Sequence, residues 1–110
     1  MRSFTFKASL LALGHFAQCN ALADKILSLD GIVLVILCLK SFSKDCRICS
    51  AANFALYMLA KSSESIRSHI VSLGGGEQIM ETLKSFPSDE NLTTIAVLAL
   101  NKIYKKNKYL

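Results

Sequence analysis

The feature that most constrains the fold of this chain is a repeat with a period of 44 residues. Residues 26–45 have the sequence ILSLDGIVLVILCLKSFSKD, and residues 70–89 have the sequence IVSLGGGEQIMETLKSFPSD. At this offset the two LKSF segments coincide, and Asp45 coincides with Asp89. A period in the low forties is typical of helical units that stack and bury their apolar faces on their neighbours. The repeat therefore predicts an all-α solenoid.

Each unit is predicted to contain a short, a medium and a long helix. In the second unit Ile66, Ile70 and Leu73 follow the i, i+4, i+7 spacing of one helix face, which predicts the short helix. Glycine adopts the left-handed conformation that ends a helix without a Cβ clash, so we expect Gly31 and Gly75 to end the short helices there. We also expect the segments Ser43-Lys44-Asp45 and Pro87-Ser88-Asp89 to form the turns and caps before the long helices, because serine and aspartate oxygens can accept hydrogen bonds from free backbone N–H groups. The predicted core positions of the long helices are Ile48, Ala52, Ala55, Leu56 and Leu59 in one and Leu92, Ala96, Ala99, Leu100 and Ile103 in the other.

A chain of 110 residues has room for one domain. The helical pattern divides it into about two and a half repeats: a partial repeat with only its third helix at 1–19, a repeat at 20–62, and a repeat with a basic tail at 63–110. Terminal repeats need a polar outer face, yet the first helix is rich in leucine. We therefore expect the sequence to be part of a longer array, or its first helix to support self-association.

Residues 1–24 have features of a secretory signal, because two basic residues precede an apolar stretch that ends in Ala-Leu-Ala. His15, Gln18 and Asn20 interrupt this stretch, and the repeat aligns it with the other third helices. We interpret it as a repeat unit. The apolar run at 31–39 is about half the roughly 20 residues that a membrane span needs, so we expect no membrane segment.

The cysteines indicate a reducing compartment. Cys19, Cys38, Cys46 and Cys49 lie within helical periodicity, whereas small secreted proteins place cysteines in loop-rich disulfide frameworks. We expect an intracellular, cytoplasmic protein, with the cilium and the nucleus as further possibilities.

The short, medium and long helices with glycine after the first resemble the armadillo repeat. The residues that carry the match are Ile26, Gly31, Leu39, Ala52, Ala55, Leu56 and Leu59 in the first copy and Ile70, Gly74, Gly75, Leu83, Ala96, Ala99, Leu100 and Ile103 in the second. The resemblance implies a right-handed superhelix whose third helices line a concave groove for an extended partner. It also implies a non-catalytic scaffold for protein–protein interaction.

The chain departs from the importin-α type of armadillo protein, which carries tryptophan and asparagine ladders on its third helices. The matching tryptophan positions hold Leu11, Phe54 and Leu98, and the matching asparagine positions hold His15, Met58 and Lys102. These departures put nuclear-import cargo binding in doubt. A finer similarity, to armadillo proteins of ciliary axonemes, is carried by Asp24-Lys25-Ile26-Leu27 and Cys38-Leu39-Lys40.

The resemblance places the expected partner-binding residues on the third helices and the basic tail. They are His15, Ser50, Phe54, Tyr57, Met58, Lys61, Lys102 and Lys105. The expected partner is an extended protein segment or a neighbouring repeat.

The net charge of +5 supports an alternative. Lysines at 102, 105, 106 and 108 could bind an acidic partner, either nucleic acid or an acidic protein tail such as those in axonemes. We do not favour nucleic acid, because few aromatic residues accompany these lysines.

We predict no catalytic residue, metal site or cofactor. Cys46-Arg47-Ile48-Cys49 is an isolated CxxC motif, and a structural zinc site needs two more ligands at suitable spacing. The equivalent residues of the second unit are Glu90 and Thr93, which commonly open helices. A redox or metal protein using the two cysteines remains the other alternative. The Gly74–Gly76 triplet lacks the strand and the Lys-Ser/Thr pair of a phosphate-binding loop.

The helical periodicity leads to a first prediction, which concerns secondary structure. The far-ultraviolet circular dichroism spectrum of the protein should be helical, because every periodic segment has a 3.6-residue repeat. A strand content above roughly a fifth would contradict the armadillo interpretation.

Overall fold

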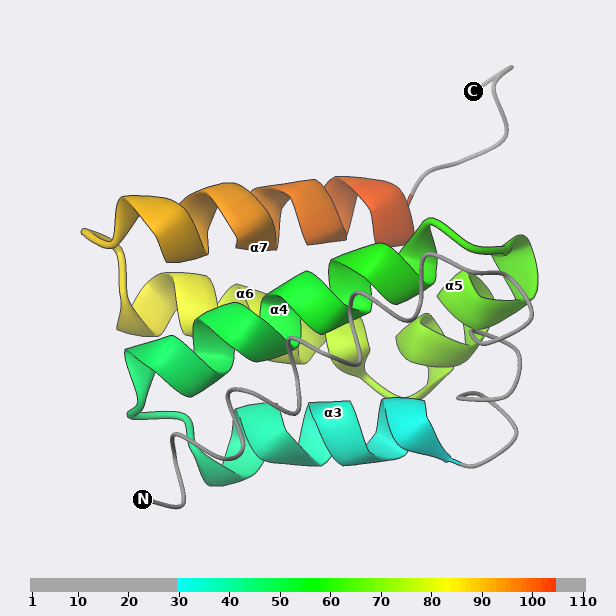
Figure 1. The fold of residues 1–110 in the computed structure, drawn as a ribbon, viewed down its shortest axis with the longest axis horizontal. Helices are drawn as coiled ribbons and strands as arrows, with labels where there is room; N and C mark the ends of the chain where they lie inside the picture. Colours follow the sequence, from blue (N-terminus) through cyan, green and yellow to red (C-terminus); the bar gives the residue numbers. More distant parts are fainter. Residues whose placement is uncertain (1–29, 105–110) are drawn as a thin grey trace.

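The computed structural model describes residues 30–104, and this range contains five α-helices and no strand (Figure 1). The helices are α3 (Gly31–Ser41), α4 (Cys46–Ala60), α5 (Glu64–Ser72), α6 (Gly75–Ser85) and α7 (Glu90–Ile103). The all-α prediction is confirmed for this range. The predicted partial repeat at 1–19 and the basic tail lie outside the described residues.

The two medium and the two long helices are arranged as equivalent pairs. In Figure 1 α3 runs antiparallel to α4, and α6 runs antiparallel to α7, so that α4 and α7 run in the same direction. The most extensive helix contact is between α4 and α7, and α3 and α6 also touch. The short helix α5 lies near the end at which α4 finishes (Figure 1). Helices from the two sequence copies thus lie side by side.

The helix boundaries keep the 44-residue offset of the sequence. α3 and α6 begin and end at positions 44 residues apart, and α4 and α7 begin 44 residues apart. In both predicted cap segments the aspartate is the residue that caps the long helix. Asp45 Oδ1 accepts hydrogen bonds from the backbone N–H groups of Arg47 (3.0 Å) and Ile48 (3.3 Å), and Asp89 Oδ1 accepts one from Leu92 (2.9 Å). Caps of this kind stabilise a helix by about 0.5–2 kcal/mol each.

The hydrophobic core is built mainly around α4. All five of its predicted core residues are fully buried, as are four of the five predicted for α7, and Leu100 is half-buried. Equivalent alanines of the two long helices are fully buried: Ala52 and Ala55 on α4, and Ala96 and Ala99 on α7. Small side chains on facing helices allow the helix axes to approach closely.

The turn between α5 and α6 differs in one residue from the prediction. Gly74, and not Gly75, adopts the left-handed conformation, with a φ of 82°. Its equivalent in the first unit is Asp30, with a φ of 60°, so Gly31 is not left-handed either. Gly75 is needed for space. A Cβ atom there would lie 2.5 Å from Ile70 Cγ2 and 3.0 Å from the Ile70 carbonyl oxygen.

A second prediction follows from the separate roles of these two glycines. Gly75→Ala should lower the free energy of unfolding by about 1–3 kcal/mol, because the added methyl group meets the backbone of Ile70 as well as its side chain. Gly74→Asp should cost less than about 1 kcal/mol, because aspartate tolerates the left-handed region and already occupies it at Asp30. Urea denaturation of both variants measures the difference, and the opposite ranking would contradict this description of the turn.

Candidate partner-binding surface on the long helices

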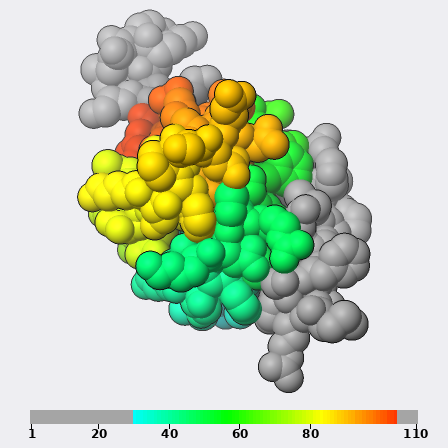
Figure 2. Space-filling model, turned by 90° about the vertical axis from the view of Figure 1, so that its left-hand side faces the viewer, coloured from blue at the N-terminus to red at the C-terminus, as the bar shows by residue number. Residues whose placement is uncertain are grey.

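A hollow of about 310 Å³ lies between the first halves of α4 and α7. Figure 2 views the end of the molecule at which both helices begin. We call this feature the α4–α7 hollow. Its lining residues are Cys46, Arg47, Ser50, Ala51 and Phe54 from α4, Asp89 from the turn, and Asn91 and Ile95 from α7.

Four of the predicted partner-binding residues form a row along α4. Ser50 and Phe54 line the α4–α7 hollow and are half-buried. Tyr57 and Lys61 follow at i+7 and i+11 from Ser50, which places them on the same side of the helix. The Lys61 Nζ atom lies 5.4 Å from the centre of the Tyr57 ring, within the range of a cation–π contact. We call Ser50, Phe54, Tyr57 and Lys61 the α4 row.

The remaining predicted residues do not join this row. Met58 is only 7% exposed and belongs to the hydrophobic core, so its assignment to the partner-binding face is corrected. The reason is that α4 is buried along ten of its 15 residues, which leaves a narrow accessible strip. Lys102 is half-buried on α7. His15 and Lys105 lie outside the described residues.

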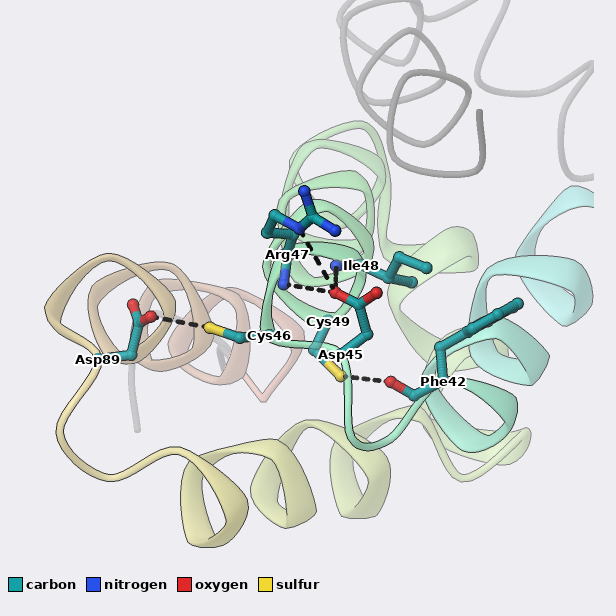
Figure 3. A network of polar contacts seen from close by, with 7 residues as sticks. All are labelled: Phe42, Asp45, Cys46, Arg47, Ile48, Cys49 and Asp89. Carbon is teal, nitrogen blue, oxygen red and sulfur yellow. Dashed lines mark hydrogen bonds and ion pairs between the residues drawn. The ribbon is translucent and has the colours of Figure 1, made fainter. Parts of the chain in front are cut away.

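Two residues that line the hollow, one from each unit, make a contact that was not predicted. The Cys46 thiol donates a hydrogen bond to Asp89 Oδ2 at 2.8 Å, while the other oxygen of this carboxylate caps α7 (Figure 3). The two cap segments of the sequence predicted that α4 and α7 would both be capped there. It did not predict the thiol contact, because that contact depends on how far α4 stands from α7.

The two cysteines of the CxxC motif make different contacts. Cys49 is fully buried, and its thiol donates to the carbonyl oxygen of Phe42 at 3.4 Å. The Cys46 thiol points toward Asp89, on the opposite side of the helix start (Figure 3). In residues 30–104 no group of three or more histidine, cysteine, aspartate or glutamate side chains could hold a metal ion.

The electrostatic surroundings keep both thiols protonated at neutral pH. Burial raises the pKa of Cys46 to about 11, assisted by the hydrogen bond to Asp89 and by the charge of that carboxylate. Burial, together with the charge of Asp45, raises the pKa of Cys49 to about 11. The hydrogen bond from Cys46 in turn lowers the pKa of Asp89. Because the thiolate is the nucleophilic form, these cysteines are poorly suited to covalent chemistry.

Comparison with known proteins identifies no relative of this chain. No family model, no curated protein and no solved structure matches the chain. The armadillo resemblance therefore stays a prediction from the sequence. The part of the chain that the structure describes has no helix with the length and apolar character of a membrane span.

The raised thiol pKa values lead to a third prediction, which concerns alkaline stability. The pKa of Cys46 is about 11 in the folded protein and 9.0 ordinarily, so between these values the unfolded chain loses a proton that the folded protein keeps. The free energy of unfolding therefore falls as the pH rises through this window. A serine at this position retains a donor for Asp89 but does not ionise there, so Cys46→Ser should reduce the decline.

Urea denaturation across this pH window measures the effect. Two pKa units correspond to about 2.7 kcal/mol, and the partial exposure of Cys46 reduces the expected difference to roughly 1 kcal/mol. Cys49→Ala, compared over the same window, reports the contribution of the second thiol. If the free energy of unfolding of Cys46→Ser has the same pH dependence as that of the parent protein, the Cys46–Asp89 contact does not have the strength that its geometry indicates.

Proposed function

We propose that the chain is a non-catalytic protein-interaction module that binds an extended protein segment along the α4 row. The observation that carries this proposal is the α4–α7 hollow, which has Ser50 and Phe54 in its wall. A segment following the row would place one side chain in the hollow and continue over Tyr57 and Lys61. The armadillo resemblance supports an extended partner on the long helices, within the superhelical solenoid that the 44-residue period predicts.

The side chains of the α4 row suit such an interface. Phe54 and Tyr57 are half-buried, so they are held in place by the core while part of each ring stays accessible. Aromatic residues with restricted side chains are the usual anchors of protein interfaces, because they bury much area at a small entropic cost. Lys61 adds a cation at one end of the row, and Arg47 and Asp89 add a cation and an anion at the other. A partner with both polar and apolar side chains fits this pattern.

The fourth prediction tests the hollow with one substitution. Ser50→Arg introduces a large side chain into the wall of the hollow and should weaken partner binding at least about tenfold, equivalent to about 1.4 kcal/mol. The probe is a set of peptides selected from a random-sequence phage library against the parent protein. Binding is measured by fluorescence anisotropy. Ser68→Arg, the same change at an exposed serine of α5, is the matched control and should leave binding unchanged.

This design avoids truncating the aromatic residues, which also pack against the core. Circular dichroism of both arginine variants checks that they remain folded. Peptides that bind equally well to Ser50→Arg would overturn the proposal. Peptides that are acidic, and whose binding is abolished by Lys105→Gln with Lys106→Gln and by added salt, would assign the interaction to the C-terminal lysines instead.

A further inference from the structure

Two pairs of equivalent positions differ strongly in exposure between the units. Ile36 on α3 is 3% exposed, whereas Met80, its equivalent 44 residues later on α6, is 48% exposed. Asn53 on α4 is fully buried, whereas its equivalent on α7, Val97, is 43% exposed. At both positions the first unit buries its residue, whereas the second unit exposes an apolar side chain.

The second unit itself covers these positions of the first unit. The end of the Ile36 side chain lies against the backbone at Gly75, so that a Cβ atom there would be 3.4 Å from Ile36 Cδ1. The Asn53 side-chain amide donates a hydrogen bond to Thr82 Oγ1 at 3.1 Å. Gly75 and Thr82 both belong to α6. The first and middle turns of α6 therefore cover this side of α3 and α4.

Among residues 30–104 no element covers the corresponding surface of the second unit in this way. Leu83 and Leu100 extend the difference, because both are half-buried while their equivalents Leu39 and Leu56 are at most 1% exposed. We call Met80, Leu83, Val97 and Leu100 the end face. None of its four side chains can ionise. Exposed apolar patches on a folded protein commonly mark a site of interaction.

We propose that the end face binds a helical unit of the same type as α6 and α7, supplied by a partner. The internal repeat specifies what that unit must look like. Its medium helix must begin with a small residue, as α6 does with Gly75, to leave room for Met80. It must also present an apolar group, or a hydroxyl bonded within its own helix, toward Val97. Thr82 already meets this condition, because its hydroxyl donates to the Ile79 carbonyl oxygen at 2.6 Å.

The fifth prediction uses the chain itself as the source of such a unit. A second copy of residues 61–104 is inserted directly after Tyr104, so that the 44-residue register continues and residues 105–110 follow it. The inserted unit should fold onto the end face, giving more helix by circular dichroism and a single cooperative thermal transition. The Val97→Lys substitution then distinguishes an inserted unit that docks on the end face from one that is accommodated without docking.

In the parent protein Val97→Lys alters an exposed residue and should change the unfolding midpoint little. In the extended protein the same change would bury an unpaired ammonium group and should lower the midpoint by more than about 5 °C. Leu34→Lys, at a site of α3 that is 61% exposed, should have a small effect in both proteins. The end face contains no residue of the α4 row, so Ser50→Arg should not affect this result.

Two outcomes would overturn the proposal. Equal effects of Val97→Lys in the parent and extended proteins, or a separate transition for the inserted unit, would show that the end face does not bind it. A concentration-dependent dimer of the parent protein, detected by sedimentation and abolished by Val97→Lys, would assign the end face to a second copy of the chain.

Discussion

The parallel packing of α4 against α7 is the contact on which the rest of the described structure depends. Both helices begin at an aspartate cap in the same kind of turn, 44 residues apart, and this brings their first turns to the same end of the molecule (Figure 1). Buried alanines on both helices permit the close approach. The α4–α7 hollow and the Cys46–Asp89 hydrogen bond both exist because the two helix starts lie next to each other.

Within residues 30–104 the medium helices of the two units share both boundaries and the long helices share their start, but the two units fill their interiors differently. The first unit has Ile32 on its medium helix and Ala60 at the end of its long helix, and both are fully buried. The equivalent residues of the second unit are Gly76 and Tyr104. A Cβ atom at Gly76 would collide with the Tyr104 ring, so the tyrosine occupies the space that a larger residue at position 76 would need. The larger residue of the pair is on the medium helix in the first unit and at the end of the long helix in the second. This exchange explains why the two units differ in sequence at these positions.

The sequence predicted the features that depend on local spacing. The helices, the Asp45 and Asp89 caps and the buried alanines all follow from apolar periodicity and capping chemistry within one unit. The left-handed residue was misplaced by one position because three successive glycines satisfy the same local pattern. The alignment of Asp30 with Gly74 carried the needed signal, since aspartate is one of the few other residues that adopt this conformation.

Features that depend on contacts between units could not be predicted in this way. The burial of Met58 results from how much of α4 the neighbouring elements cover, and a helical wheel of α4 alone does not contain that information. The same applies to the Cys46–Asp89 contact. Helical spacing did place Ser50, Phe54, Tyr57 and Lys61 together, because those positions share one side of a single helix.

The buried Asn53 indicates how the inner contact and the end face differ in selectivity. Its amide donates to Thr82, while its Oδ1 atom has no hydrogen-bond partner among the described residues. A buried acceptor without a partner lowers the free energy of unfolding. A buried polar pair can fix the register of two helices, because sliding either helix leaves the amide group unpaired. The end face has Val97 at the equivalent position and lacks that constraint. A unit docked there would be positioned by shape, through the fit of Met80 against a small residue. The Asn53–Thr82 pair therefore helps to hold α4 and α6 in register.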